Sequence, residues 1–321
     1  MSREEVKITL SGILVLDKPK GLSSTEAMEK VKKLLKIKKI GHGGTLDPIS
    51  TGVLPLFLNE ATKIAQIFLE GDKVYEGTFK LGLVTDTYDI TGEVLEKHEP
   101  QDIDLEKLKK VAQSLVGEIE QIPPPYSAVK FRGRPLYKYA RDGLLIPADP
   151  RKIRIYHFDI LSLENNIASF YIKCSKGTYV RSLIHHLGKL LECGAVLLSL
   201  RRLQKSIFTI EEALTLDEIE NIVLTDLEKI KEYIISIPRA LEFLPKVIVS
   251  EEFAQKVRLG KLINKNSFLS LIKFQKLSLS SSEKWIRIVD IKGNLVALIH
   301  NPLLQGNSPY LSYLRVFKSA L

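Results

Sequence analysis

The sequence predicts an α+β fold: a mixed, largely antiparallel sheet flanked by helices, followed by a small β-rich C-terminal domain. Segments typical of strands and of helices follow one another without the regular alternation of a doubly wound sheet. No internal repeat is visible, and after about residue 246 the chain changes to short β-like runs with a strong positive charge. A chain of 321 residues is long enough for two domains of this kind.

The first half of the chain begins with a compact apolar run, Gly12 to Asp17, which predicts a buried strand and ends in the turn sequence KPKG. Ser23 and Ser24 stand before an amphipathic segment over residues 25–37, which predicts a capped helix with a lysine-rich outer face. The sequence further predicts a helix over Asn59 to Leu69 and a strand over Tyr75 to Leu83, followed by the turn-like TDTYDITG.

Residues 123–154 stand apart from the rest of the first domain. This stretch contains a PPP run, several glycines and many basic and aromatic residues, and long irregular segments of this kind are usually functional or disordered. Helices are predicted on either side of it, over Asp104 to Leu115 and Tyr179 to Leu191, and strands over Arg154 to Leu161 and Ala168 to Cys174. We therefore expect one domain over residues 1–237 with an insert at about 123–154.

The C-terminal domain is expected over residues 246–321, after a boundary where Pro238 and Pro245 bracket a short helix-like piece. Its β-like runs are KWIRIVD, NLVALIH and YLRVFK, and it contains twelve lysines and arginines against four acidic residues. The whole chain has a formal net charge of +9. A basic β-rich domain favours docking to nucleic acid, although a dimerisation domain and a merely basic surface are alternatives.

Other features exclude several classes of protein. The only cysteines are Cys174 and Cys193, without a CxxC motif or a histidine pair at zinc-ligand spacing, so neither a disulfide framework nor a structural zinc site is expected. The first residues lack the apolar core of a secretory signal, and no apolar stretch is long enough for a membrane span. We expect a cytoplasmic protein that does not bind a membrane, a metal ion or a cofactor.

The loop GHGGTLDPISTG gathers His42, Thr45 and Asp47 among glycines. Glycines let a backbone approach a ligand closely and adopt positive φ. A phosphate-binding loop is excluded, because the Gly-Lys-Ser/Thr ending is missing and Asp47 would repel a phosphate. A tight turn capped by Asp47 ahead of Pro48 is the structural alternative, but it leaves the neighbouring histidine and threonine unexplained.

The longer motif KIGHGGTLDPISTGVLPL resembles the signature of the TruB family of tRNA pseudouridine-55 synthases. Further segments resemble the family's motifs in the same order: GILVLDKPKGLSS, YEGTFKLGLVTDTYDITG, QIPPPYSAVKFRGRPLYKYAR, CSKGTYVRSL and LRRL. The resemblance covers about Gly12 to Leu203, and the basic tail is similar in character to an RNA-binding PUA domain.

The resemblance implies roles for particular residues. Asp47 matches the essential catalytic carboxylate, and Arg181 matches the basic residue that pairs with it. Tyr75 matches the aromatic residue that stacks on the uracil and is a candidate proton acceptor at C5. Substrate-binding roles are implied for six more residues: His42, which helps to open the RNA loop, Leu200 in the pocket, Tyr179 beside Arg181, Lys18 in the first motif, and Lys130 and Arg132 in the insert.

The resemblance further implies that the chain isomerises uridine 55 in the T-arm loop of tRNA, after flipping the base out of its stack. The reaction is redox-neutral and transfers no outside group, so no cofactor is needed. The C-terminal domain is expected toward the acceptor end of the tRNA, and the chain is expected to be a monomer without an obligate protein partner. Two alternatives stay open: a relative guided by H/ACA RNA, which the insert at Tyr126 to Arg141 argues against, and a non-enzymatic tRNA-folding chaperone.

Overall fold

The computed structural model describes residues 10–144, 146, 148–280 and 283–317. The chain forms two compact units. The larger comprises residues 14–57 and 65–233. The smaller comprises residues 58–64 and 234–321, together with the segment that ends at Ile13.

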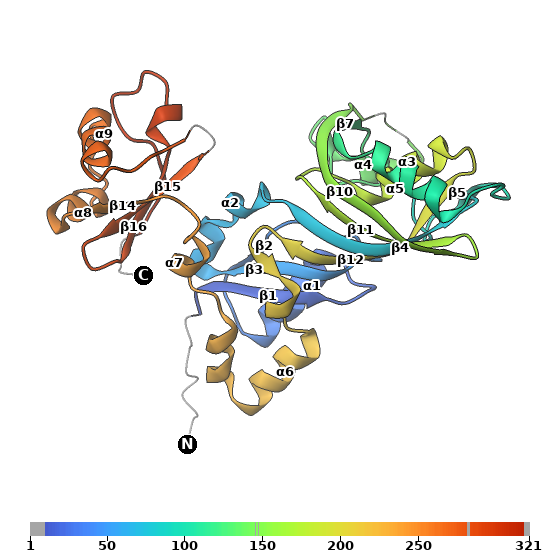
Figure 1. The fold of residues 1–321 in the computed structure, drawn as a ribbon. Coiled ribbons are helices and arrows are strands. Elements are labelled where there is room, and N and C mark those ends of the chain that lie inside the picture. The colour runs from blue at the N-terminus through green and yellow to red at the C-terminus, as the bar shows by residue number, and fades with distance from the viewer. Residues whose placement is uncertain (1–9, 145, 147, 281–282, 318–321) are drawn as a thin grey trace. The chain divides into compact units, whose positions relative to one another are not determined.

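A nine-stranded sheet is the framework of the larger unit (Figure 1). Its main path runs in the order β1-β3-β12-β4-β11-β10-β7, and β2 and β13 are attached to β3 and β12. The central strand β12 (Ala195–Lys205) pairs antiparallel with β4 (Lys73–Leu81) and parallel with β3 (Thr51–Leu58). The other strands are β1 (Gly12–Lys18), β2 (Ile40–His42), β7 (Gly117–Gln121), β10 (Arg151–Glu164), β11 (Ile167–Cys174) and β13 (Phe208–Thr209).

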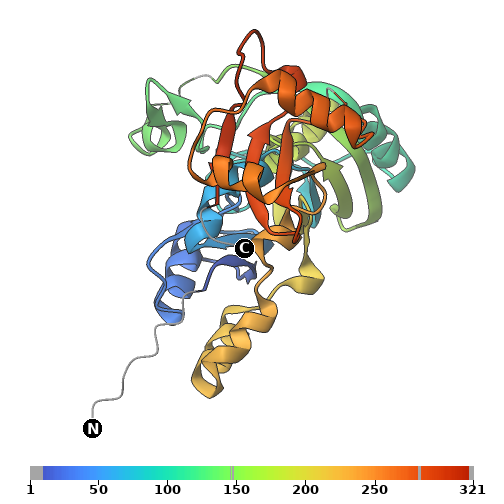
Figure 2. The same ribbon diagram turned by 90° about the vertical axis from the view of Figure 1, so that its left-hand side faces the viewer.

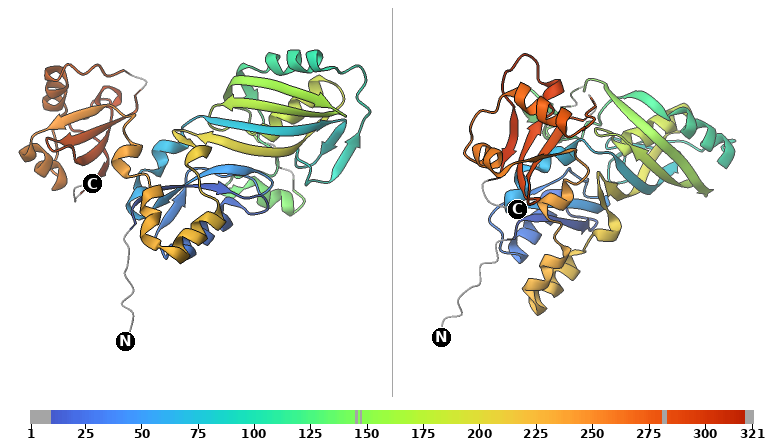
Figure 3. Two further views of the ribbon diagram at one scale, coloured as in Figure 1. Left: turned by 60° about the horizontal axis from the view of Figure 1, so that its bottom comes forward. Right: turned by 60° about the vertical axis from the view of Figure 1, so that its left-hand side comes forward.

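Two helices cover the half of this sheet that contains β10, β11 and β4. Helix α3 (Leu105–Ser114) packs on β10, as the left panel of Figure 3 shows, and α5 (Val180–Leu190) packs on β12. Between them and the sheet lies an apolar core whose largest side chains are Phe79, Phe158 and Phe170, all fully buried. The remaining helices of the unit are α1 (Ser24–Leu34), α2 (Ala65–Leu69), α4 (Leu136–Arg141) and α6 (Leu216–Thr225).

Helix α1 begins where its sequence predicts. Ser23 is the N-cap, because its hydroxyl accepts a hydrogen bond from the Glu26 amide while the Glu26 carboxylate accepts one from the Ser23 amide. Ala27 and Val31 face the interior, and the lysines of the segment lie on the outer side. The predicted cap is therefore confirmed.

Two predicted elements are interrupted in the structure. The helix predicted over Asn59 to Leu69 is a 3-10 segment, η1 (Asn59–Lys63), followed by α2, and the two are separated at Ile64, whose φ of -111° and ψ of -2° end the first segment. The strand predicted up to Leu83 stops at Leu81. Gly82 has a φ of 84°, and the chain bends there into a separate hairpin of β5 (Leu83–Thr85) and β6 (Val94–Lys97).

The stretch over 123–154 is more regular than its composition suggests. It holds a two-stranded hairpin, β8 (Lys130–Phe131) with β9 (Arg134–Pro135), and then α4. Its last residues belong to the main sheet, since β10 begins at Arg151 and pairs with β7 from that residue onward. The strand expected from Arg154 thus starts three residues earlier.

The smaller unit contains a four-stranded sheet in the order β14-β15-β16-β17, shown with its helices in Figure 2. The three predicted runs form β15 (Trp285–Asp290), β16 (Leu295–His300) and β17 (Tyr313–Val316), and β14 (Lys246–Val249) pairs parallel with β15. Three helices accompany them: α7 (Ile237–Ala240), α8 (Glu251–Arg258) and α9 (Lys265–Phe274). The predicted fold class, a mixed sheet with helices and a small β-rich C-terminal part, is confirmed.

A buried arginine fixes the position of β3 and its preceding loop against β12. The Arg202 side chain is fully buried, and its guanidinium donates to the carbonyls of Val53 at 2.7 Å, Thr45 at 3.2 Å and Gly44 at 3.2 Å. The backbones meet closely at this point, since a Cβ on Gly52 would lie 2.2 Å from the Arg202 carbonyl oxygen. Arg202 therefore connects β12 to the loop that contains Asp47.

We expect Arg202→Met to lower the free energy of unfolding by about 3 kcal/mol or more, because buried carbonyls lose their donors without gaining water. The adjacent Arg201→Met is the matched control. Arg201 forms a partly exposed ion pair with Asp17 at 2.7 Å, so its loss should cost about 1 kcal/mol or less. Urea unfolding of both variants measures the difference, and equal losses would contradict the structural role of Arg202.

Candidate active site

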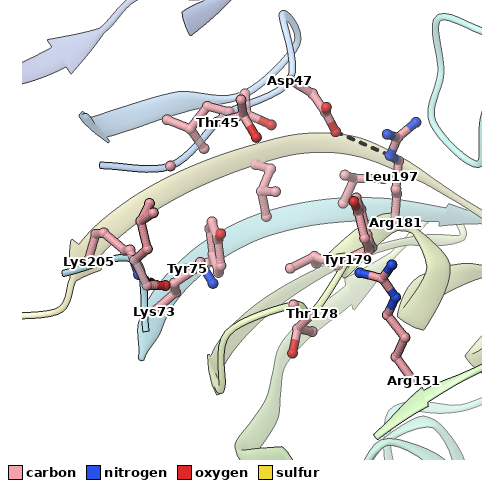
Figure 4. Close-up of a pocket in the computed structure, with 17 residues that line it drawn as sticks. Thr45, Asp47, Lys73, Tyr75, Arg151, Thr178, Tyr179, Arg181, Leu197 and Lys205 are labelled. Carbon is pink, nitrogen blue, oxygen red and sulfur yellow. Dashed lines mark hydrogen bonds and ion pairs between the residues drawn. The ribbon is translucent and has the colours of Figure 1, made fainter. Parts of the chain in front are cut away.

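A cavity of about 220 Å³ opens in the larger unit beside the loop of Asp47 (Figure 4). Its walls come from this loop, from β4 and β12, and from the N-terminal end of α5, so segments distant in the sequence meet in it. The residues that line it are Gly44, Thr45, Leu46, Asp47, Ser50, Leu69, Lys73, Tyr75, Arg151, Gly177, Thr178, Tyr179, Val180, Arg181, Leu197, Leu200 and Lys205.

The loop that carries Asp47 is anchored on both sides of that residue. The Ser24 hydroxyl, in the first turn of α1, accepts a hydrogen bond from the Leu46 amide at 2.7 Å and donates to the Leu46 carbonyl at 3.0 Å. After Asp47, the Pro48 carbonyl accepts from the Gly21 amide at 2.8 Å. These contacts fix the backbone, so the Asp47 side chain is presented to the cavity by a rigid turn.

Arg181, the second residue of α5, faces Asp47 across the cavity wall. Its Nε lies 3.1 Å from Asp47 Oδ2, in an ion pair that lacks the alignment of a hydrogen bond. The same guanidinium donates from Nη1 to the Thr87 carbonyl at 3.2 Å and from Nη2 to the Tyr126 carbonyl at 2.6 Å. Because its side chain is only 6% exposed, Arg181 keeps one orientation toward the carboxylate.

Two opposing effects act on the Asp47 carboxyl. Burial of the group raises its pKa above the ordinary value, since desolvation disfavours the charged form. The positive charge of Arg181 lowers the pKa and is the largest counteracting influence, with a smaller contribution of the same sign from Lys18. The side chain is 41% exposed because it faces the open cavity. Ionisation of Asp47 therefore depends on the neighbouring arginine.

Tyr75 forms part of the cavity wall in the middle of β4. Burial raises the pKa of its hydroxyl to about 12, so the group is a neutral phenol near pH 7. The Arg202 guanidinium contacts this hydroxyl and acts in the opposite direction, favouring the phenolate. The ring thus offers a face to the cavity, and its oxygen has a cationic neighbour that can stabilise a transient negative charge.

Of the other residues of the predicted site, some line the cavity and others lie outside it. Tyr179, the N-cap of α5, and Leu200 of β12 both line the cavity. His42 lies on β2 outside the lining, and burial lowers the pKa of its imidazole. Lys18 is completely buried, and its ammonium donates to the carbonyls of Pro19 at 2.8 Å and Leu22 at 2.6 Å. Lys18 therefore acts on Asp47 through its charge and offers no accessible group to a ligand.

Lys130 and Arg132 lie away from the cavity, at the exposed β8–β9 hairpin of the insert. Arg132 has a φ of 48° at the tip of the turn, and its guanidinium lies 5.3 Å from the ring centroid of Phe131. The insert reaches the site through its base, where the Tyr126 carbonyl contacts Arg181.

The structure also places residues at the site that the sequence reasoning did not single out. Asp89 has a side chain only 6% exposed, with Oδ2 3.9 Å from Arg181 Nη1, and its position within the TDTYDITG turn was the available signal. Lys73, Arg151 and Lys205 line the cavity as well. Their sequence neighbourhoods are those of ordinary strand residues, so only the pairing of distant strands brings them to the site.

Among the described residues, no group of three or more histidines, cysteines, aspartates and glutamates is arranged to hold a metal ion. Within the same ranges, no helix has both the length and the apolar character required to cross a membrane.

Comparisons with known proteins agree with the motifs. Two family models match consecutive stretches: the TruB family pseudouridylate synthase (N terminal domain) over residues 32–180, and the tRNA pseudouridylate synthase B C-terminal domain over residues 181–242. The chain is 41% identical to the tRNA pseudouridine synthase B of Clostridium kluyveri, over 81% of this chain and 88% of that protein. It is 38% identical to the protein of the same name from Clostridium perfringens, over 84% of this chain and 90% of the other.

Solved structures show the same fold. A Cbf5-Nop10-Gar1 complex contains a chain that matches with a TM-score of 0.72 at 28% identity, covering 95% of this chain and 84% of that one. An H/ACA RNP bound to a substrate RNA containing 2'-deoxyuridine matches with a TM-score of 0.70 at 26% identity, covering 98% and 87%. With family models over residues 32–242 and full-length relatives at about 40% identity, the chain belongs to the TruB family of pseudouridylate synthases.

Proposed function

We propose that this pseudouridine synthase converts uridine 55 in the T-arm loop of tRNA to pseudouridine, with Asp47 as the essential carboxylate. The observation that carries the proposal is the Asp47–Arg181 ion pair at 3.1 Å in a cavity lined by Tyr75. The two Clostridium relatives are tRNA pseudouridine synthases B, which supports tRNA as the substrate. The guided relatives in the solved structures are less similar in sequence, at 28% and 26% identity.

The reaction breaks the bond between N1 of uracil and C1′ of the ribose, rotates the base and forms a bond between C5 and C1′. The proton at C5 leaves and a proton is bound at N1, so atoms and electrons balance without an outside reactant. A carboxylate can support this sequence only while it is ionised. Arg181 favours that form against the desolvation of the cavity wall, which is the role we assign to it.

The target base has to leave its stack in the RNA loop before it can enter the cavity, at a cost of a few kcal/mol. Stacking on an aromatic face returns roughly 1–3 kcal/mol. We assign this contact to Tyr75, with Leu200 and Tyr179 completing the pocket. We further assign to the Tyr75 oxygen the transfer of the C5 proton, since Arg202 is placed to stabilise its anionic form.

Contacts with the rest of the tRNA are assigned to the exposed cations outside the cavity. Lys130 and Arg132 of the insert are placed to contact phosphates, which position an RNA without reading its sequence. The basic C-terminal domain is assigned to the acceptor end of the tRNA. His42 is assigned to opening the T-arm loop of the RNA. The chain is proposed to act as a monomer without an obligate protein partner.

Asp47→Asn keeps the shape of the side chain and removes its charge. We expect tRNA binding to persist and turnover to fall by roughly a thousandfold or more, because no other ionisable acid lines the cavity. Incubation with an unmodified tRNA transcript, followed by chemical mapping of pseudouridine, measures the loss and the modified position. Asp159→Asn, an exposed aspartate of β10 outside the cavity, is the control. Persistent turnover by Asp47→Asn would refute the assigned role.

Tyr75→Phe retains the ring and removes the hydroxyl. Binding of a T-arm hairpin should change by less than about threefold, while single-turnover chemistry should slow by roughly 100-fold if the oxygen moves a proton. Tyr75→Leu should weaken binding as well, since the stacking face is lost. If the single-turnover rate of Tyr75→Phe is unchanged, the proton-transfer role is rejected and only the stacking role is left.

Arg181→Met removes the charge that holds Asp47 ionised. Desolvation and the negative charge of Asp89 then act against Lys18 alone, so the pKa of Asp47 rises further and the variant loses activity at a higher pH than the native enzyme. The acid limb of the pH–kcat profile should therefore move to higher pH, with at least a tenfold lower rate at pH 7. Arg181→Lys keeps the charge and should show a smaller displacement. A slow variant whose acid limb has not moved points to loss of orientation instead.

A further inference from the structure

The cavity has a second charged end. Figure 4 shows Lys73 and Lys205 together on one side of Tyr75, and both line the cavity. The Asp47–Arg181 pair lies on the other side of the ring. Neither lysine takes part in the chemical steps assigned above, so their place in the wall needs a separate explanation.

The two lysines are brought together by strand pairing. Lys205 of β12 is the Cα partner of Lys73 of β4. Residues opposite each other in an antiparallel pair have Cβ atoms about 4.5–5.5 Å apart, and like charges in such positions repel. Burial lowers the pKa of Lys73 to about 8 and that of Lys205 to about 7, and the charge of Lys73 contributes to the second shift. The fold therefore maintains two opposed cations at a desolvated position.

The two ammonium groups differ in their protein partners. Lys205 is 1% exposed, and its Nζ donates to the carbonyls of Leu69 at 3.1 Å and Gly71 at 2.7 Å. These acceptors are neutral, and the negative charge of Asp72 favours the protonated form of both lysines without forming an ion pair with either in the described part of the chain. For Lys73, no carboxylate in the described part of the chain lies within the 4.0 Å of an ion pair. A half-buried cation without a counterion is unfavourable unless a ligand supplies the opposite charge.

The balance of charge over the whole lining points the same way. Among the described residues of the lining, Asp47 is the one carboxylate, against the basic side chains of Lys73, Lys205, Arg151 and Arg181. Arg181 is already paired with Asp47. Three basic side chains are left over, in a concave site where low-dielectric walls concentrate the field of their positive charges.

We propose that Lys73 binds a phosphodiester of the substrate RNA that adjoins the nucleoside held at Asp47, and that the charge of the buried Lys205 beside it adds to the attraction. A carbonyl or ring nitrogen of the base could satisfy hydrogen bonds, but it would not supply the negative charge that these two lysines attract. A phosphodiester carries the required negative charge and accepts charge-assisted hydrogen bonds. The ligand class rests on the proposed function, because it takes the bound strand to be RNA.

Binding of an anion at this position favours the protonated lysines. The complex therefore takes up protons when it forms, and affinity falls as pH rises through the range of about 7 to 8 in which the free amines lose them. A lysine that only supports the fold would give no such dependence of RNA affinity on pH.

The test compares Lys73→Met with Lys80→Met in the full chain, using a T-arm hairpin RNA. Both residues lie on β4 and both variants lose one positive charge, but Lys80 is exposed and outside the cavity. We expect Lys73→Met to bind the hairpin roughly tenfold or more weakly. The slope of log Kd against log salt should also fall by about 0.7–0.9, and the pH dependence should flatten. Lys80→Met should leave all three unchanged, and Lys73→Arg should restore affinity.

Methylphosphonate substitution of single phosphodiester linkages in the hairpin tests the same contact with the native protein, so this experiment does not require that Lys73→Met fold correctly. Neutralising the contacted linkage should weaken binding to the native enzyme and have no further effect on Lys73→Met. If no linkage behaves in this way, or if Lys73→Met matches Lys80→Met, the subsite is overturned. Pseudouridine formation by the native enzyme on the same hairpin distinguishes failure of the phosphate subsite from failure of the proposed function. If the native enzyme turns over and Lys73→Met binds the hairpin as tightly as it does, only the subsite is rejected. If the native enzyme neither binds nor modifies the hairpin, the proposed function is rejected as well.

Discussion

The site depends on a single guanidinium, because Arg181 is the point at which three separate segments meet. Its Nε faces Asp47, its Nη1 donates to the Thr87 carbonyl at 3.2 Å, and its Nη2 donates to the Tyr126 carbonyl at 2.6 Å. The last two contacts come from the turn after β5 and from the base of the insert. An ammonium group could reach only part of this set, since it lacks the planar fork of donors. The residue therefore has a structural task, holding the turn and the insert in place, and an electrostatic one, favouring ionised Asp47.

A second buried arginine, Arg202, also holds the site together. Arg202 fixes the loop of Asp47 through the carbonyls of Gly44 and Thr45, and it also contacts the Tyr75 hydroxyl. Within the described ranges, Arg202 forms no ion pair with a carboxylate, and its contacts there are carbonyl dipoles and the phenol oxygen. Desolvation lowers its pKa, yet a guanidinium stays protonated at neutral pH. The two arginines together explain how a wall built largely from apolar strands can hold a carboxylate beside a buried phenol.

Local patterns predicted much of the fold, and their failures have physical causes. The capped helix after Ser23 and the three strands of the C-terminal domain follow from short-range periodicity and capping, which depend on neighbouring residues only. The break at Gly82 and the turn at Asn59 involve positive φ values, which hydrophobic periodicity does not predict. In the candidate site, the resemblance singled out Asp47 and Arg181, which lie 3.1 Å apart, and it implied a substrate-binding role for Lys18, whose side chain is fully buried. Lys73 and Lys205 could not be found from the sequence, because only the register of β4 with β12 makes them neighbours.

The charge asymmetry of the cavity connects these observations. A lone carboxylate among several cations is easier to ionise than one in a neutral cavity, and the same excess of positive charge attracts a phosphate-bearing ligand. Ionisation of Asp47 and binding of a phosphate are compatible only if different cations serve them. A phosphate bound directly to Arg181 would compete with Asp47 for the same guanidinium. The fold makes this division by placing Arg181 at the start of α5 and the lysines at the far ends of β4 and β12, with the ring of Tyr75 between them. An anion can then be held in the cavity without neutralising Arg181, the positive charge that acts most strongly on Asp47.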